Sequence, residues 1–207
     1  MNTNLGRIPS FTPASCEVDD YKIEMLLIVQ KPWNDPTRKS YLTSNPKYIS
    51  FANQKVVYYQ LNFVDEHQIK DREKPDAKWL NQRTLNSPIW YAGRTSDIIG
   101  RGIDVRTINK DCLIFVKATS PSKVGFNDEQ QGHLEFLMIE DLFLRMGRDG
   151  IINVDNQKRE KPKFERGGSE DRTMRKILDF ILETLHDWEL PGFRISPPCV
   201  PSKTGID

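Results

Sequence analysis

The segment between residues 89 and 101 constrains the fold of this chain more than any other part of the sequence. A short apolar run, Ile89-Trp90-Tyr91-Ala92, ends at Gly93 and is followed by a Thr95-Ser96-Asp97 cluster. This pattern predicts a strand that stops at the glycine and a helix that Ser96 or Asp97 can cap. Arg101 would lie on the second turn of that helix. A phenol and a guanidinium would then meet at one end of a strand, where they can hold a phosphodiester.

Composition limits the classes of protein to which the chain can belong. Its 207 residues suit one domain, and 30 basic against 29 acidic residues leave a net charge of +1. Any contact with nucleic acid must therefore come from local clusters of charge. The longest apolar run, Met25 to Val29, is too short to span a bilayer, and the N-terminus lacks a signal-peptide pattern. We expect a cytoplasmic protein without membrane contact. Three widely spaced cysteines predict neither a zinc site nor a disulfide framework.

The hydrophobic pattern predicts the order of the elements. Residues 1–19 are polar and are expected to form a loose arm. In the run 56–63, Tyr59 shares a face with Leu61 and is expected in the core, whereas Tyr58 shares the other face with Gln60. The run 112–116 is almost wholly apolar and predicts a central strand. We expect strands at 21–29, 56–63, 89–92 and 112–116, and helices from Asp128 to Met146 and from Ser169 to about Trp188.

This order of elements resembles the GIY-YIG nuclease family. Val56-Val57-Tyr58 corresponds to the first motif and Tyr91-Ala92-Gly93 to the second, although the first lacks its glycine and Ala92 replaces an isoleucine. The resemblance implies an α/β (α+β) fold with a small three-stranded β-β-α-β-α core. The expected units are an N-terminal extension packed on the core at 1–54, the core at 55–156 with an insertion at 65–88, and a basic loop, C-terminal helix and flexible tail at 157–207.

The resemblance also implies an activity and a set of catalytic residues. The chain is expected to hydrolyse phosphodiester bonds of DNA as a divalent-metal-dependent endonuclease, of restriction or defence type. Mg²⁺ or Mn²⁺ would be held by one carboxylate together with waters and phosphate oxygens. Tyr58 would position the water, Tyr91 would contact the phosphate and Arg101 would clamp a phosphate oxygen. The metal ligand would be Glu135, and Asn153 would support the site.

The helix that carries the glutamate leaves alternatives open. Glu140 also fits the motif, and it lies five positions after Glu135, about 140° around the helix axis. The two carboxylates therefore cannot face one site. His133 is a further candidate, as a proton shuttle.

Basic side chains near these positions are candidates for contact with the DNA backbone. The expected partner is DNA, in the first place double-stranded DNA. A homodimer is also expected, since its two active sites would suit a double-strand cut. The candidates for phosphate contact are Arg94, Arg106, Lys158, Arg159, Lys161 and Lys163.

Two other interpretations compete with an active GIY-YIG nuclease. One is a catalytically inactive module on the same fold that binds nucleic acid or protein. The other is a PD-(D/E)xK-type nuclease that uses Asp104 and Lys117, but Phe115 occupies the position of its second carboxylate. The sequence has no GxGxxG, GxSxG or HExxH motif that would favour another class of α/β enzyme.

Overall fold

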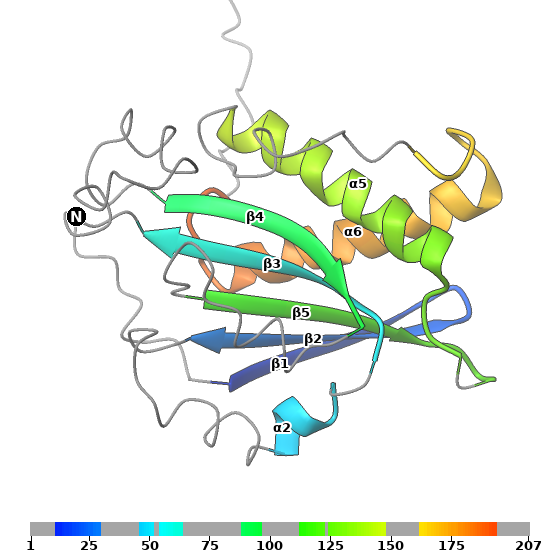
Figure 1. Cartoon of the computed structure of the whole chain (residues 1–207), viewed down its shortest axis with the longest axis horizontal. Coiled ribbons are helices and arrows are strands. Elements are labelled where there is room, and N and C mark those ends of the chain that lie inside the picture. Colours follow the sequence, from blue (N-terminus) through cyan, green and yellow to red (C-terminus); the bar gives the residue numbers. More distant parts are fainter. Residues whose placement is uncertain are drawn as a thin grey trace, which may run out of the picture.

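The described part of the chain folds into one antiparallel sheet with two long helices on one of its faces (Figure 1). The computed structural model describes residues 11–29, 46–51, 54–63, 88–96, 112–122, 124–147 and 162–193. Its strands are β1 (Phe11–Val18), β2 (Tyr21–Val29), β3 (Val56–Phe63), β4 (Pro88–Thr95) and β5 (Cys112–Thr119). Its helices are α2 (Pro46–Ile49), α5 (Asp128–Met146) and α6 (Ser169–Asp187).

The sheet has five strands within the described residues, in the order β1-β2-β5-β3-β4. Each neighbouring pair is antiparallel. The expected mixed α/β class is confirmed, but the expectation of a three-stranded core is wrong. Residues 11–29, instead of forming a loose arm and a separate strand, make a β1–β2 hairpin that extends the sheet through the pairing of β2 with β5. This pairing satisfies the backbone N–H and C=O groups along the second edge of β5. β5 is therefore the central strand, as its apolar sequence predicts.

Helices α5 and α6 cover one face of the sheet and bury the main core. In Figure 1, α5 lies above β4 and α6 is seen behind the strands. On this one face, α5 contacts β4, β3 and α6, and α6 contacts β1. Alternate side chains of the strands point into this layer, among them Met25, Tyr59, Trp90 and Ile114. The predicted core position of Tyr59 is confirmed, because its ring is fully buried between Trp90 and Phe193.

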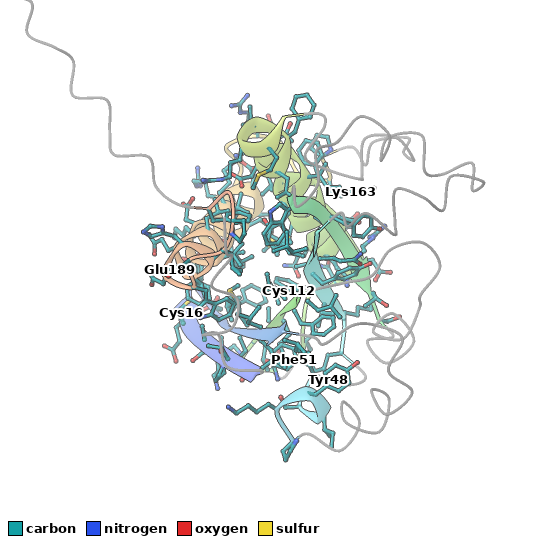
Figure 2. All side chains as sticks on the ribbon, turned by 90° about the vertical axis from the view of Figure 1, so that its left-hand side faces the viewer. Cys16, Tyr48, Phe51, Cys112, Lys163 and Glu189 are labelled. Atoms are coloured by element: carbon teal, nitrogen blue, oxygen red, sulfur yellow. The ribbon has the colours of Figure 1, made fainter. Side chains whose placement is uncertain are left out.

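The opposite face carries a second apolar cluster, which α2 helps to cover. Figure 2 shows Tyr48 and Phe51 on the side of the sheet away from Lys163. These two aromatic residues pack with Tyr58 and Phe115 from the neighbouring strands β3 and β5. Tyr58, expected on a polar face with Gln60, therefore belongs to a second core, and only 4% of its surface is exposed.

Helix α5 begins and ends close to the residues that its sequence predicts. Asn127 caps it reciprocally: its side chain accepts from the Gln130 N–H, and the Gln130 side chain accepts from the Asn127 N–H. Gly147 follows the last turn with φ of +66°, a conformation that glycine adopts without strain. The first turns of α5 are buried although they are mostly polar, and the candidate site lies around them.

Candidate functional site

The centre of the candidate site is an ion pair between β4 and α5. Trp90 and Ala92 point from β4 into the helix-covered core, and strand alternation brings Arg94 to the same face. There Arg94 Nε lies 3.2 Å from Glu135 Oε2. Only 8% of the Glu135 side chain is exposed, against 33% for Arg94. A nearly buried carboxylate therefore contacts a guanidinium that still reaches solvent, a balance of charge that permits the burial of Glu135.

Backbone contacts fix the direction of the arginine. Arg94 Nη1 donates to the Asp128 carbonyl oxygen at 3.1 Å, and the Asp128 carboxylate forms an ion pair with Lys55. The Gln131 side chain donates to the Val56 oxygen at 2.7 Å and to the Thr95 oxygen at 3.3 Å. These contacts tie the paired ends of β3 and β4 to α5. The strand end that carries Arg94 is thereby held at a fixed position relative to Glu135.

A glycine in the second turn of α5 lies next to Arg94 and to a second basic side chain, that of Lys163. A β-carbon at Gly132 would lie 2.9 Å from Arg94 Nη1 and 3.3 Å from Lys163 Cε. Arg94 and Lys163, which come from different elements, therefore converge over the same turn of the helix. The absence of a side chain at residue 132 makes this approach possible.

The buried His133 binds the backbone of the segment that contains Lys163. Its Nδ1 accepts from the N–H groups of Lys163 at 3.1 Å and Phe164 at 3.3 Å. Because Nδ1 accepts, the ring proton lies on Nε2, which donates to Asp171 Oδ1 at 2.9 Å. Both ring nitrogens are thus engaged in contacts that join α5, α6 and the segment 162–168. This arrangement gives His133 a structural role and leaves no ring nitrogen for the proton shuttle that the sequence suggested.

Asp171 completes this connection as a buried carboxylate at the start of α6. Burial by itself raises the pKa of its carboxyl group, but hydrogen bonds from Arg175, from the Gly167 N–H and from His133 outweigh it. The pKa of Asp171 therefore lies well below its ordinary value. The charged form anchors the segment before α6 at neutral pH.

The two tyrosines of the motif lie together, but not with Glu135. The rings of Tyr58 and Tyr91 are 5.8 Å apart, and a β-carbon at Gly93 would lie 2.7 Å from the Tyr58 hydroxyl and 2.6 Å from Tyr91 Cε1. Both rings belong to the second apolar cluster, on the face of the sheet opposite α5. Arg94 follows Tyr91 by three residues, so alternation along β4 turns the two side chains to opposite faces. The structure therefore does not gather Tyr58, Tyr91 and Glu135 at a single point on one face.

Of the competing carboxylates on α5, one is enclosed and the other is not. Glu135 is buried beside Arg94, whereas Glu140 is exposed. Several other candidates lie outside the described residues. These are Arg101, Arg106, Asn153, Lys158, Arg159, Lys161 and Asp104.

Lys117 has structural partners on the second face. Its Nζ lies 3.1 Å from Glu24 Oε2, donates to the Ser50 oxygen at 3.1 Å and lies 4.6 Å from the centre of the Phe51 ring. These contacts join the residues around α2 to β5 and β2. The arrangement is that of a buried structural lysine, and the PD-(D/E)xK interpretation finds no support in it.

The site offers one enclosed carboxylate with two cations nearby. Within the ranges that the structure describes, no three His, Cys, Asp or Glu side chains are grouped so that they could hold a metal ion. The sequence reasoning missed Lys55, Gln131, Gly132 and Asp171. A glycine inside a helical pattern was the one local signal for Gly132, whereas the partners of the other three depend on long-range packing.

Comparison with protein-family models, with curated proteins and with solved structures finds no match to this chain. No helix in the described part of the chain has the length and apolar character needed to cross a membrane.

Proposed function

We propose that this chain is a divalent-metal-dependent endonuclease of the GIY-YIG type, which hydrolyses phosphodiester bonds of DNA at a centre formed by Glu135 and Arg94. The observation that carries the proposal is the enclosure of Glu135, the carboxylate that the motif resemblance expects on this helix, against Arg94 at 3.2 Å. Lys163, also expected to contact the backbone, lies at the same turn of α5.

The donor chemistry of the site fits a hard divalent cation. Mg²⁺ and Mn²⁺ prefer carboxylate oxygens, and Mg²⁺ commonly uses one or two carboxylates together with waters and substrate phosphates. Glu135 supplies such a carboxylate, and Arg94 Nε contacts one of its oxygens, Oε2. When bound, the cation supplies a water nucleophile and neutralises charge on the phosphate.

The protein groups around Glu135 would bind and orient the phosphodiester. The Arg94 guanidinium has a planar set of donors that matches phosphate oxygens, and part of it faces solvent. Lys163 adds a positive charge beside it. Such preorganised cations stabilise the negative charge that develops during phosphoryl transfer.

Tyr91 can still contribute to the site from the other face. β4 lies at the end of the strand order, so it is an edge strand of the described sheet. A nucleic-acid backbone that passes this edge can contact the partly exposed Tyr91 on one face and Arg94 on the other. In this arrangement Tyr91 would contact a phosphate next to the one at Glu135.

A second candidate function is a module on the same fold that binds nucleic acid or protein without cleaving. The observation in its favour is that the sheet separates Tyr58 and Tyr91 from Glu135. Such a module would retain the basic surface at Arg94 and Lys163.

Cleavage of supercoiled plasmid DNA tests the proposal. The wild type would be incubated with Mg²⁺ or Mn²⁺, with an EDTA control, beside Glu135→Gln, Glu140→Gln and Arg101→Ala. We expect metal-dependent cutting that Glu135→Gln and Arg101→Ala abolish. Glu140→Gln is the matched control, because it removes an exposed carboxylate from the same helix. If the wild type binds DNA but does not cut it with either metal, the binding module is favoured. If only Glu140→Gln loses cutting, Glu140 and not Glu135 is the metal ligand.

A further inference from the structure

We infer that Gly132 is a positioning residue of the proposed site, because its missing side chain leaves the space in which Arg94 and Lys163 converge to take one phosphate group of a nucleic-acid backbone. The inference rests on the proposed function and adds to it a residue that would not touch the substrate. It also gives a role to the segment 162–168.

Glycine is an unfavourable choice for this position on local grounds. Residue 132 lies in the second turn of α5, where alanine would stabilise the helix more than glycine does. A β-carbon there would lie 2.9 Å from Arg94 Nη1, closer than packed atoms normally approach, and 3.3 Å from Lys163 Cε. Alanine would therefore push the guanidinium away from its present place.

Arg94 and the backbone of Lys163 are held at this turn by other contacts. Arg94 is fixed by the Asp128 carbonyl oxygen and by Glu135. The backbone of Lys163 is fixed by His133 Nδ1, which in turn is oriented by Asp171. The places of Arg94 and of the Lys163 backbone beside Gly132 thus follow from the fold.

Two basic side chains at one helical turn indicate the chemistry of the ligand. A guanidinium and a lysine side chain that approach the same turn attract an anionic group. Glu135 provides one negative charge next to Arg94. A phosphate group suits both cations, since it accepts from the forked guanidinium and from the ammonium at the same time.

The test measures binding separately from cleavage. Affinity for a short duplex DNA would be determined in EDTA over a range of salt concentrations, for the wild type, Gly132→Ala, Lys163→Gln and the double variant. Thermal unfolding of each variant would be followed in parallel. Leu144→Ala is the control, because it changes a largely exposed residue near the other end of α5.

We expect Gly132→Ala to unfold close to the temperature of the wild type, because the helical preference of alanine offsets the displaced contacts of Arg94, and yet to bind DNA about tenfold more weakly. The slope of log affinity against log salt should fall by about one for Lys163→Gln, as for the loss of one phosphate contact. The double variant should lose little more than either single variant, because both changes disable the same contact.

Each contrary result has a distinct meaning. A wild type that neither binds nor cuts DNA would overturn the proposed function and this inference together. If the wild type binds and cuts DNA while Gly132→Ala retains its affinity and salt slope, only the inference fails. If Gly132→Ala does not fold, an unchanged affinity and salt slope in Lys163→Gln, which alters an exposed residue, would be enough to reject it.

Discussion

Arg94 and Glu135 contact each other at 3.2 Å across the boundary between the edge strand β4 and the first turns of α5. Around this pair the helix presents polar side chains that are buried and that contact different elements. Gln130 donates to the Tyr21 hydroxyl of β2, Gln131 binds the ends of β3 and β4, and His133 binds Asp171 of α6. Fully partnered polar groups of this kind hold a site rigidly, because each would be costly to leave unpaired.

Replacing Arg94 by lysine keeps the positive charge at this position but removes the planar guanidinium. Lysine cannot reach both Glu135 and the Asp128 carbonyl oxygen with a planar fork. We expect Arg94→Lys to retain most of the DNA affinity while single-turnover cleavage falls at least about tenfold. Arg94→Ala should also lose about 1–3 kcal/mol of unfolding free energy, because Glu135 loses its partner. Arg145→Lys is the control, since it makes the same replacement in another ion pair, that of Arg145 with Asp141 on α5. An Arg94→Lys variant with full cleavage would remove the guanidinium from the mechanism.

The two motif tyrosines should differ in their effect on cleavage. Tyr58→Phe keeps the ring against Phe115 and Tyr91 and should cost about 1 kcal/mol of unfolding free energy. Its cleavage rate should stay within a few-fold of the wild type, because Tyr58 lies across the sheet from Glu135. Tyr91→Phe should weaken cleavage further, since Tyr91 is partly exposed on the edge strand. Single-turnover assays with both variants decide this point. If a folded Tyr58→Phe were inactive, the chemistry would belong to the tyrosine face.

Asp171 should make the stability of the protein sensitive to acid. Its pKa is lower in the folded state than in the unfolded chain, so its stabilisation is fully present above the unfolded pKa of about 3.9. That stabilisation is lost as the pH falls through the folded pKa. We expect Asp171→Asn to be less stable than the wild type at neutral pH and to lose less stability on acidification. Denaturant unfolding at a series of pH values measures both effects, with the exposed Asp187→Asn as control. Parallel pH profiles for the wild type and Asp171→Asn would contradict the assignment.

Lys117 should matter for stability and not for catalysis. Lys117→Met removes the contacts with Glu24 and with the Ser50 carbonyl oxygen, and should cost about 1–3 kcal/mol of unfolding free energy. Cleavage per folded molecule should be unchanged. Lys22→Met is a matched control, because Lys22 lies 3.8 Å from the same Glu24 carboxylate but is largely exposed. A stable Lys117→Met variant without cleavage would revive the PD-(D/E)xK interpretation.

Local sequence patterns were sufficient to predict most of the elements and part of their packing. Helix α5 spans Asp128–Met146 as expected, because a reciprocal cap begins it and a glycine follows it. Alternation along β3 separated Tyr59 from Tyr58 correctly, since successive side chains of a strand point to opposite faces. The apolar run of β5 predicted its central place in the sheet. These features depend on neighbours within a few residues.

Long-range packing determined the rest. Nothing in the local pattern of residues 11–18 shows that they extend the sheet as β1, because their pairing partner is β2 and the support of β2 is β5. Alternation assigns Tyr58 and Tyr91 to one face and Arg94 to the other, but it does not say which face α5 covers. Only the tertiary structure places α5 on the face of Arg94, and thereby brings Glu135 to that arginine and leaves the tyrosines in a second core. A sequence pattern records which side chains share a surface, whereas the choice of surfaces that meet follows from the burial of the whole apolar area.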